Sequence, residues 1–339
     1  MESGQSDDGA SHGHMSTVVE TAKELEALAG GYDEEEEDCT PLPNGLICSR
    51  QNWEMMYGKF GGSFEDETDA PPMRNTDRPV PPYYLPISMM QFFSVKVIEI
   101  MGGLQWPLHV YGIVATRDSQ DNKRNFLFRC DREHCQILTS PQDSCLTLTG
   151  PSRAIVMVNP VVVEVDLKVK GSRGPPSEDK VLSEHAFVHN HHGHRIKPGF
   201  PHRQLESTED SRMEFVFAHL QSAVEATITA RVVEGSPDFR ARFTARTAGI
   251  DEDVLLLDSQ DGKVVVNDGG FVVLRRRVVC VQGTGKLILR LEASTDHGGD
   301  GTAVVKEEIF CARKTSRSQG CFMLGFCKLS IIIAWSLLP

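Results

Sequence analysis

The sequence lacks several features that would assign it to a familiar class of protein. No two of its nine cysteines are spaced as C-x-x-C, which argues against a zinc ribbon or a dithiol redox site. It has no N-x-S/T acceptor, and its first residues are polar, so we expect no secretory signal peptide. Scattered, odd-numbered cysteines favour free thiols in a reducing compartment. We predict a cytoplasmic protein, with the nucleus as the alternative.

Catalytic motifs are also missing. The string Gly283-Thr284-Gly285-Lys286 resembles part of a phosphate-binding loop. However, Leu287–Leu291 alternates as a strand where that loop requires a helix. The string Gly150-Pro151-Ser152-Arg153 does not form the G-x-S-x-G pattern of a nucleophile elbow. We therefore predict no catalytic residue, no cofactor and no enzymatic activity.

Acidic residues are concentrated near the N-terminus. Residues 1–80 carry 18 Asp and Glu against five Lys and Arg, while the whole chain has a formal net charge of −12. The remainder is therefore close to neutral and has no overall field for nucleic acid or membrane. Because β-branched residues are also scarce here, residues 1–82 are predicted to be a disordered acidic tail. A capping pattern followed by helical spacing predicts one short helix near residues 17–29.

From Phe92 onward, apolar and polar residues alternate in nearly every segment. In the run Val161–Lys170, every second residue is valine or leucine, and the residues between them include Glu164, Asp166 and Lys168. A period of two is typical of antiparallel strands that have one buried face. The sequence therefore predicts an all-β protein.

The predicted strands fall into two halves with a similar order. The first half contains Phe92–Ile100, Leu108–Thr116, Asn125–Arg129, Leu146–Thr149, Arg153–Val158, Val161–Lys170 and Lys180–Val188. The second half contains Ala226–Val233, Phe239–Ala245, Val254–Leu257, Phe271–Leu274, Arg277–Val281, Lys286–Glu292 and Thr302–Cys311. We predict two antiparallel β-sandwich lobes related by internal duplication, the first over residues 83–215 and the second over residues 216–339.

The last segment, Phe322–Leu338, has the length of a short membrane span. Lys328 lies near its middle, where a bilayer would impose a cost of about 2.5–3.5 kcal/mol. Leu329, Ile331 and Ile333 alternate with other residues as in a strand. We predict that this segment is the buried closing strand of the second lobe, and that the protein has no membrane partner.

Several strings resemble a plant family, found mainly in cereals, known as domain of unknown function 6598. The similarity extends from about Trp53 to the C-terminus and includes PPMRNTDRP (Pro71–Pro79), FSVKVIEIMGGLQWPLHVYGIVATRD (Phe93–Asp118), LTLTGPSRAIV (Leu146–Val156), LKVKG (Leu167–Gly171), SAVEATITARVVEGS (Ser222–Ser236), DEDVLLLDSQDGKV (Asp251–Val264) and GFCKLSIIIAWSLL (Gly325–Leu338). The family has no established activity. Some relatives resemble fusions to a ribosome-inactivating domain, which implies a role in defence or stress.

Histidines gather in one short stretch of the chain, His185–His202. Imidazoles as closely spaced as those of His189, His191 and His194 can converge on one zinc or copper ion. Glu184 is the only carboxylate beside them, and Gly193 and Pro198 indicate a loop. The three histidines are therefore the candidate metal ligands, and an adventitious metal-binding loop is the competing interpretation.

Three sets of charged residues have ordinary structural explanations. The tetrapeptide Asp-Ser-Gln-Asp occurs at Asp118–Asp121 and at Asp258–Asp261, where calcium is one interpretation and a hairpin turn is the better one. Arg240, Arg242 and Arg246 would line one strand face, which can engage RNA or be a solvated sheet face. Ribosome-inactivating N-glycosylases carry a glutamate and, three residues later on the same helix, an arginine. Here Glu225 is followed at that spacing by Ile228, in a stretch that alternates as a strand, so we predict that the chain does not depurinate ribosomal RNA.

Together these observations predict a non-enzymatic binding or interaction module of a plant-specific family, with a protein as its partner. The alternative is an accessory or degenerate relative of ribosome-inactivating proteins that acts on translation, for which the partner would be the ribosome or RNA.

Overall fold

The computed structural model describes residues 45–60, 62–171, 175–190, 197–260, 262–295 and 303–338. The predicted helix near residues 17–29 and the acidic run at residues 33–38 lie outside these residues. The described part is mostly β, and its paired strands are antiparallel, as the alternation predicted.

Four helical segments and sixteen strands occur in the described residues. The helical segments are α2 (Gly45–Tyr57), η1 (Gly58–Phe60), η2 (Arg132–His134) and η3 (Pro176–Glu178). The strands are β1 (Ile87–Ile100), β2 (Leu108–Arg117), β3 (Asn125–Cys130), β4 (Gln136–Leu138), β5 (Ile155–Val156), β6 (Val161–Val169), β7 (Lys180–His189), β8 (Pro201–Ser207), β9 (Ser211–Gly235), β10 (Arg240–Thr247), β11 (Val254–Asp258), β12 (Val278–Gln282), β13 (Lys286–Ser294), β14 (Ala303–Cys311), β15 (Ser316–Met323) and β16 (Cys327–Ser336). Most predicted strands overlap these, but Leu146–Thr149 and Phe271–Leu274 form no named strand.

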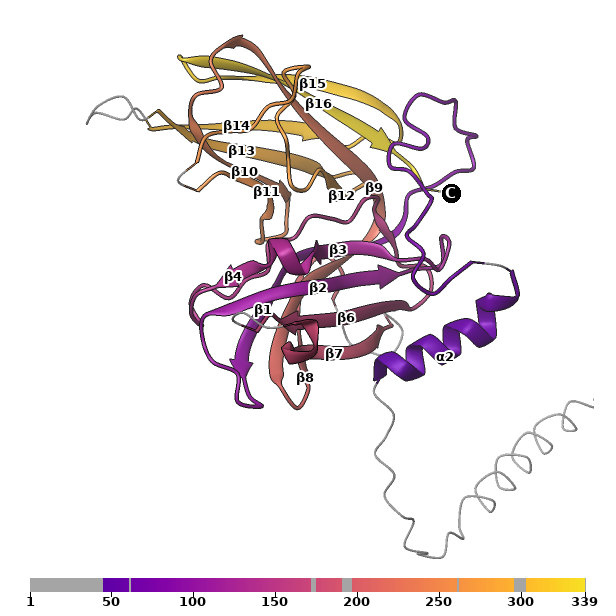
Figure 1. Cartoon of the computed structure of the whole chain (residues 1–339). Coiled ribbons are helices and arrows are strands. Elements are labelled where there is room, and N and C mark those ends of the chain that lie inside the picture. Colours follow the sequence, from indigo (N-terminus) through magenta and orange to yellow (C-terminus); the bar gives the residue numbers. More distant parts are fainter. Residues whose placement is uncertain are drawn as a thin grey trace, which may run out of the picture. The chain divides into compact units, whose positions relative to one another are not determined.

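A seven-stranded sheet built on β9 connects the two halves of the chain. Its main order is β15-β16-β9-β1-β5, and β8 and β12 also pair with β9. The N-terminal part of the 25-residue β9 pairs with β1 and β8, whereas its C-terminal part pairs with β12 and β16. Figure 1 shows β9 running from one half into the other. The predicted boundary between residues 215 and 216 is therefore wrong, because one continuous strand crosses it.

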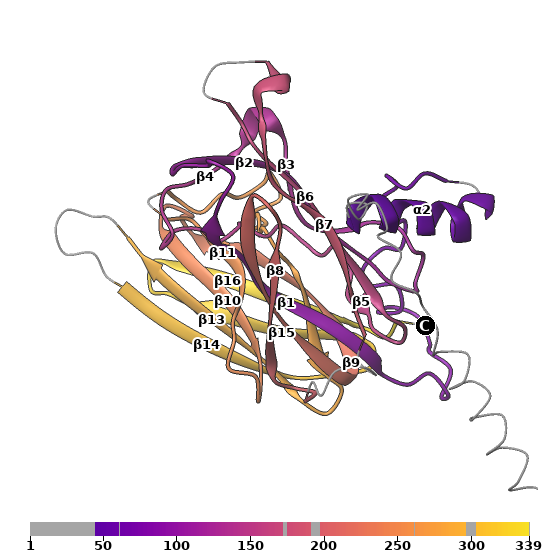
Figure 2. The ribbon, with the colours of Figure 1, turned by 90° about the horizontal axis from the view of Figure 1, so that it is seen from below.

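Two smaller sheets complete the lobes. The first-lobe sheet has the order β3-β2-β6-β7, with β4 paired to β2, and the second-lobe sheet has the order β11-β10-β13-β14 (Figure 2). Alternate side chains of β9 enter different cores, since Phe215 and Phe217 belong to the first-lobe core and Val216 and Ala218 to the other. This division follows from the period of two along a strand.

Both lobes arrange their strands in the same order. In the shared sheet, the first lobe has β8-β9-β1-β5 and the second has β15-β16-β9-β12. The two smaller sheets also match, with β3-β2-β6-β7 corresponding to β11-β10-β13-β14. The agreement favours an internal duplication, which stays a prediction.

The predicted tail extends too far, because residues 45–82 contain α2 and a segment bound to both lobes. We call residues 62–77 the strap. Its Thr68 amide donates to the Arg124 carbonyl at 2.9 Å, and its Met73 amide donates to Glu225 Oε1 at 2.7 Å. The Asn75 amide donates to Ser336 Oγ at 2.9 Å. The polar composition of this segment suggested disorder, but its backbone amides are hydrogen-bonded to the lobes.

The C-terminal segment is buried, as predicted, but it contains parts of two strands. β15 ends at Met323, Gly325 turns the chain at φ +88°, and β16 begins at Cys327. β16 lies between β15 and β9, and Trp335 on it is fully buried, with its Nε1 donating to Ser318 Oγ at 2.9 Å. No helix in the described ranges is long and apolar enough to cross a membrane.

Candidate functional site

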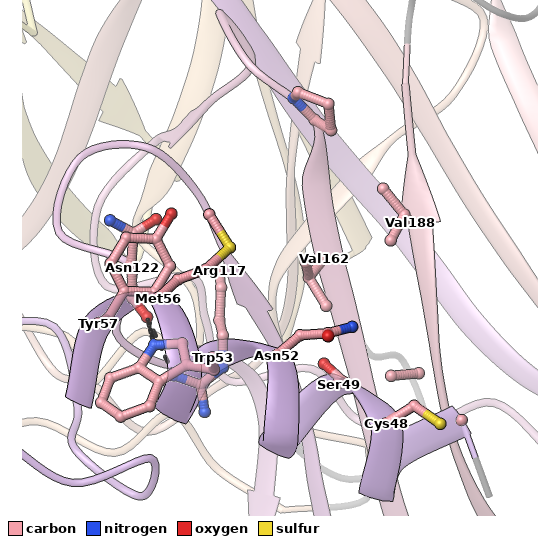
Figure 3. A pocket seen from close by; sticks show the side chains of 13 residues that line it. Cys48, Ser49, Asn52, Trp53, Met56, Tyr57, Arg117, Asn122, Val162 and Val188 are labelled. Carbon is pink, nitrogen blue, oxygen red and sulfur yellow. Dashed lines mark hydrogen bonds between the residues drawn. The ribbon is translucent and has the colours of Figure 1, made fainter. Parts of the chain in front are cut away.

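A cavity of about 410 Å³ lies between helix α2 and the outer face of the first-lobe sheet. We call it the α2 groove. Helix α2 contributes most of one wall, and β2, β6 and β7 contribute the other (Figure 3). Its lining residues are Gly45, Cys48, Ser49, Asn52, Trp53, Met56, Tyr57, Arg117, Asn122, Pro160, Val162, Ala186 and Val188.

The register of three strands builds the sheet side of the groove. Val162 on β6 is the partner of Arg117 on β2 and of Val188 on β7. The neighbouring row places Glu164 beside Ala186. Because Val161 and Val163 enter the core, the residues between them must point to the opposite face. The alternation that built the lobe thus also supplies the floor of the groove.

One face of α2 supplies the helix side. Ser49, Asn52, Trp53 and Met56 recur every three or four residues, so they share that face. Figure 3 shows Ser49 and Asn52 directed toward the side of the groove formed by Val162. At the helix start, a Cβ on Gly45 would lie 3.1 Å from the Ala186 carbonyl oxygen. The helix therefore begins almost against the backbone of β7.

Trp53 fixes the helix to the turn between β2 and β3. Its buried indole donates from Nε1 to the Asn122 carbonyl at 2.8 Å and meets the Phe64 ring edge-on at 5.7 Å. Asn122 adopts a left-handed φ of +55° in that turn. An asparagine accepts this conformation more readily than most residues, so the turn can present its carbonyl to the helix.

The same turn contains the first Asp-Ser-Gln-Asp string, and it is a hairpin turn, as predicted. The Asp118 carboxylate is buried and accepts hydrogen bonds from Arg153 Nη1 at 2.6 Å and Nη2 at 2.8 Å. It also accepts from the Val156 amide at 2.7 Å. The second string begins at Asp258, the last residue of β11, and its residue 261 lies outside the described residues, so the hairpin turn stays a prediction there. There Asp258 lies 3.3 Å from Arg242.

A buried ion-pair cluster lies beneath the groove. Glu164 is 0% exposed and lies 3.1 Å from Arg117 Nη2 and 2.9 Å from Arg124 Nε. The Arg117 guanidinium stacks on Phe64 at 3.9 Å from the ring centroid and donates to the Asn122 carbonyl at 3.0 Å. Burial lowers the pKa of Arg117, and the nearby Glu164 carboxylate opposes that shift. Both Nη atoms of Arg117 are thus engaged, and the residue supports the groove wall.

The chemistry of the groove suits binding. Its lining combines aromatic and aliphatic side chains with a few polar groups, namely the hydroxyls of Ser49 and Tyr57, the amides of Asn52 and Asn122, the Cys48 thiol and the Arg117 guanidinium. Among the described lining residues there is no carboxylate or imidazole to transfer a proton. Apolar walls with a few polar groups are the usual composition of ligand pockets.

The predicted histidine site is only partly described. His189 ends β7 and is buried, with its ring 4.7 Å from Phe217 and 5.9 Å from His202. His191 and His194 lie outside the described residues, so the three-histidine site stays a prediction. Within the described ranges, no group of three or more His, Cys, Asp or Glu side chains could hold a metal ion.

The other charged candidates are engaged in the fold. Glu225 is fully buried, and its carboxyl accepts hydrogen bonds from the amides of Met73 and Ala154 at 2.7 and 2.8 Å. Arg246 lies 2.8 Å from Asp253 and 3.2 Å from Asp251. Together with the Arg242–Asp258 pair, this contact neutralises much of the predicted basic strand face.

A protein-family model described as "Domain of unknown function (DUF6598)" matches residues 89–333. The chain belongs to this family. The match covers both lobes and the shared sheet, while α2 and the strap lie before it. A search of curated proteins finds no match.

Two solved structures of human GIVD cytosolic phospholipase A2 show a weak similarity. One has 9% identity and a TM-score of 0.25, covering 74% of this chain and 31% of that chain. The other, in complex with methyl gamma-linolenyl fluorophosphonate, has 8% identity and a TM-score of 0.24, with 74% and 32% covered. The chain thus spans about a third of their length. TM-scores this low do not show a common fold.

Proposed function

We propose that this protein is a non-enzymatic binding module that holds an apolar side chain of a partner protein in the α2 groove. The preformed cavity of about 410 Å³, with its aromatic and aliphatic walls, carries this proposal. Ligand pockets commonly measure about 300–1,000 Å³, so this one suits a side chain or a short peptide segment. Ser49 and Asn52 supply hydrogen-bonding groups that can orient the bound segment.

The surface beside the groove favours a protein as the occupant. Met55 and Met56 are 66% and 56% exposed, and Phe60, just after the helix, is 84% exposed. Apolar side chains that gather on a surface are typical of protein contacts, and methionine adapts to varied partners. The role in plant defence or stress that the family resemblance implies stays a prediction.

Selection of peptides from a random displayed library on the purified chain would test the groove. We expect the enriched peptides to share one large apolar residue. Val188→Trp should fill the groove and weaken their binding by about tenfold or more, equivalent to about 1.4 kcal/mol. Val188 is 59% exposed, so the variant should fold.

Val158→Trp is the matched control, because Val158 is 51% exposed and does not line the groove. Its binding should equal that of the unchanged chain. Equal weakening by both variants, or no weakening by Val188→Trp, would contradict the proposal.

The alternative function, an action on ribosomes, leads to a prediction about Glu225. Its carboxyl is occupied by two backbone amides under the strap and is not exposed to a nucleobase. Side chains alternate along the strand, so Glu225 and Ile228 point to opposite faces. An arginine at position 228 would therefore not lie beside the glutamate, as the reaction requires. We expect no aniline-sensitive cleavage of ribosomal RNA after treatment with the purified chain. Cleavage that disappears in Glu225→Gln would show that the protein is an N-glycosylase.

A further inference from the structure

Cys135 lies in a second pocket, at the opposite end of β2 from the α2 groove. This pocket has a volume of about 700 Å³ and is lined by residues that include Leu104, His109, Lys170 and Lys180. Cys135 is half-buried in it, directly after η2. A reagent in solution can therefore reach the thiol within a concave site.

An imidazole accompanies this thiol. Cys135 Sγ lies 3.7 Å from His109 Nδ1. His109 points away from the core because its neighbours on β2, Leu108 and Val110, are both fully buried. A thiol paired with a histidine base is the arrangement that activates cysteine nucleophiles.

A polar network holds the Cys135 backbone in place. Arg132 on η2 donates to both carboxylate oxygens of Asp179, from Nε at 2.6 Å and from Nη2 at 3.0 Å. The Tyr111 hydroxyl donates to the same carboxylate at 2.7 Å, and the Gly171 amide donates to it at 2.9 Å. Tyr111 lies on β2 two residues after His109, so one network anchors both sides of the pair.

The other described cysteines provide internal comparisons. Cys280 and Cys327 are buried, and burial raises the pKa of both thiols, which disfavours their reactive thiolate forms. Cys311 and Cys321 are exposed, on β14 and β15. The reaction rates of these two thiols show how fast a cysteine of this chain reacts because of solvent exposure alone.

We propose that Cys135 is a thiol–disulfide exchange site, that His109 is its base, and that the pocket takes a small disulfide carrying carboxylates. Lys170 and Lys180 line the pocket against one carboxylate, Glu178. Lys180 Nζ donates to the Gly103 carbonyl at 3.0 Å, and Lys170 lies 3.5 Å from Glu133, which is largely exposed. Among the residues that line the pocket, two cations stand against one carboxylate, which favours an anionic reagent over a neutral one.

The exchange balances without an additional oxidant. The Cys135 proton moves to His109 Nδ1, and the resulting thiolate attacks one sulfur of the disulfide. A new bond forms between Cys135 and that sulfur while the original sulfur–sulfur bond breaks. The second sulfur leaves as a thiolate with the bonding electron pair and takes the proton from His109. The Cys135 sulfur is thereby oxidised from the thiol to the disulfide level, and the departing sulfur is reduced from the disulfide to the thiol level.

The test uses the full-length chain and oxidised glutathione, with site-resolved mass spectrometry to follow the rate at each cysteine. We expect Cys135 to react about tenfold faster than Cys311 and Cys321. His109→Gln should lower the Cys135 rate by about tenfold and leave the Cys311 rate unchanged. Lys180→Met should slow the reaction with oxidised glutathione but not with neutral hydroxyethyl disulfide.

Unchanged thermal unfolding of each variant would show that the pocket is intact. The proposal is overturned if Cys135 reacts no faster than Cys311 and Cys321. It is equally overturned if His109→Gln leaves the Cys135 rate unaltered, since exposure would then explain the reaction. Equal slowing of both disulfides by Lys180→Met would contradict the anionic preference.

Discussion

The two lobes share a strand order but differ in what covers the outer face of their smaller sheets. In the first lobe, α2 and the strap cover that face, and Glu164 on β6 is buried between two arginines. In the second lobe, ion pairs on the corresponding face are open to solvent. Arg290 and Glu307, for example, are 45% and 51% exposed at a separation of 3.4 Å.

This difference shows how one sheet geometry can serve two purposes. Exposed ion pairs contribute about 0–1 kcal/mol each, so the second-lobe face depends little on any one of them. A buried pair is costly to break, because the remaining charge has lost its water and its partner. Because the first-lobe face is covered, its ion pairs are buried and contribute to the stability of the fold. The space that remains between α2 and the sheet is the α2 groove.

Two buried arginines extend the comparison. Arg153 lies two residues before β5, and Arg276 lies two residues before β12, its counterpart in the other lobe. Arg153 pairs with Asp118 at 2.6 Å and with Asp121 at 3.2 Å. Arg276 donates to the backbone carbonyls of Phe92 and Phe93 at 2.7 and 3.4 Å, next to a bulge in β1. Burial lowers the pKa of Arg276 to about 10.

Replacing each of these arginines by methionine should produce the largest contrast. Arg153→Met leaves Asp118 buried without its cation, so the free energy of unfolding should fall by about 3–5 kcal/mol. Arg276→Met removes a cation that pairs only with carbonyl groups among the described residues, and the loss should stay below about 2 kcal/mol. Urea unfolding of both variants measures the difference. Equal losses would mean that the two arginines have the same role.

A smaller contrast is expected between glutamates on the covered and open faces. Glu164→Gln should lower the free energy of unfolding by about 3 kcal/mol, because Arg117 and Arg124 lose their shared carboxylate. Glu292→Gln in the second lobe removes an exposed pair with Arg290, at 3.0 Å, and should cost less than about 0.5 kcal/mol. Thermal unfolding at matched pH would show this. A large loss in Glu292→Gln would contradict the contrast between the two faces.

Lowering the pH should decrease the free energy of unfolding through His185, and this effect should be smallest near neutral pH. Burial lowers the pKa of His185 to about 4, and its ring packs against Phe187 and Phe215. The unfolded chain binds the proton at pH values below about 6.5, so stability is complete above that pH and declines as the pH falls toward 4. The loss attributable to this residue should reach up to about 3 kcal/mol.

The measurement is the difference in unfolding free energy between the unchanged chain and His185→Leu, taken from pH 7 to pH 4. Carboxylates titrate in both proteins and cancel in this difference. We expect the variant to lose less stability over this range. Parallel curves would show that His185 is protonated equally in the folded and unfolded chains.

The strands could be predicted from the sequence because their signal is local. The predicted strand Val161–Lys170 corresponds to β6, Val161–Val169. The alternation of apolar and polar residues that indicates a strand lies within the segment itself. Helix α2 was missed because its groove face mixes Ser49 and Asn52 with Trp53 and Met56, and its first turn has no acidic residue. The groove itself had no sequence signal. Arg117 and Glu164 meet only through the register of β2 and β6, and no spacing along the chain encodes that register.

The long strand β9 has a consequence for the order in which the chain acquires its structure during synthesis. All first-lobe strands exist once Gly235 has been made, whereas the C-terminal part of β9 must wait for β16 at the end of the chain. Until then, Ile228 and Ala230 occupy a strand edge without its final neighbour. Unpaired apolar edges invite association between nascent chains. The C-terminal part of β9 is therefore an association-prone edge of this chain until β16 has been made.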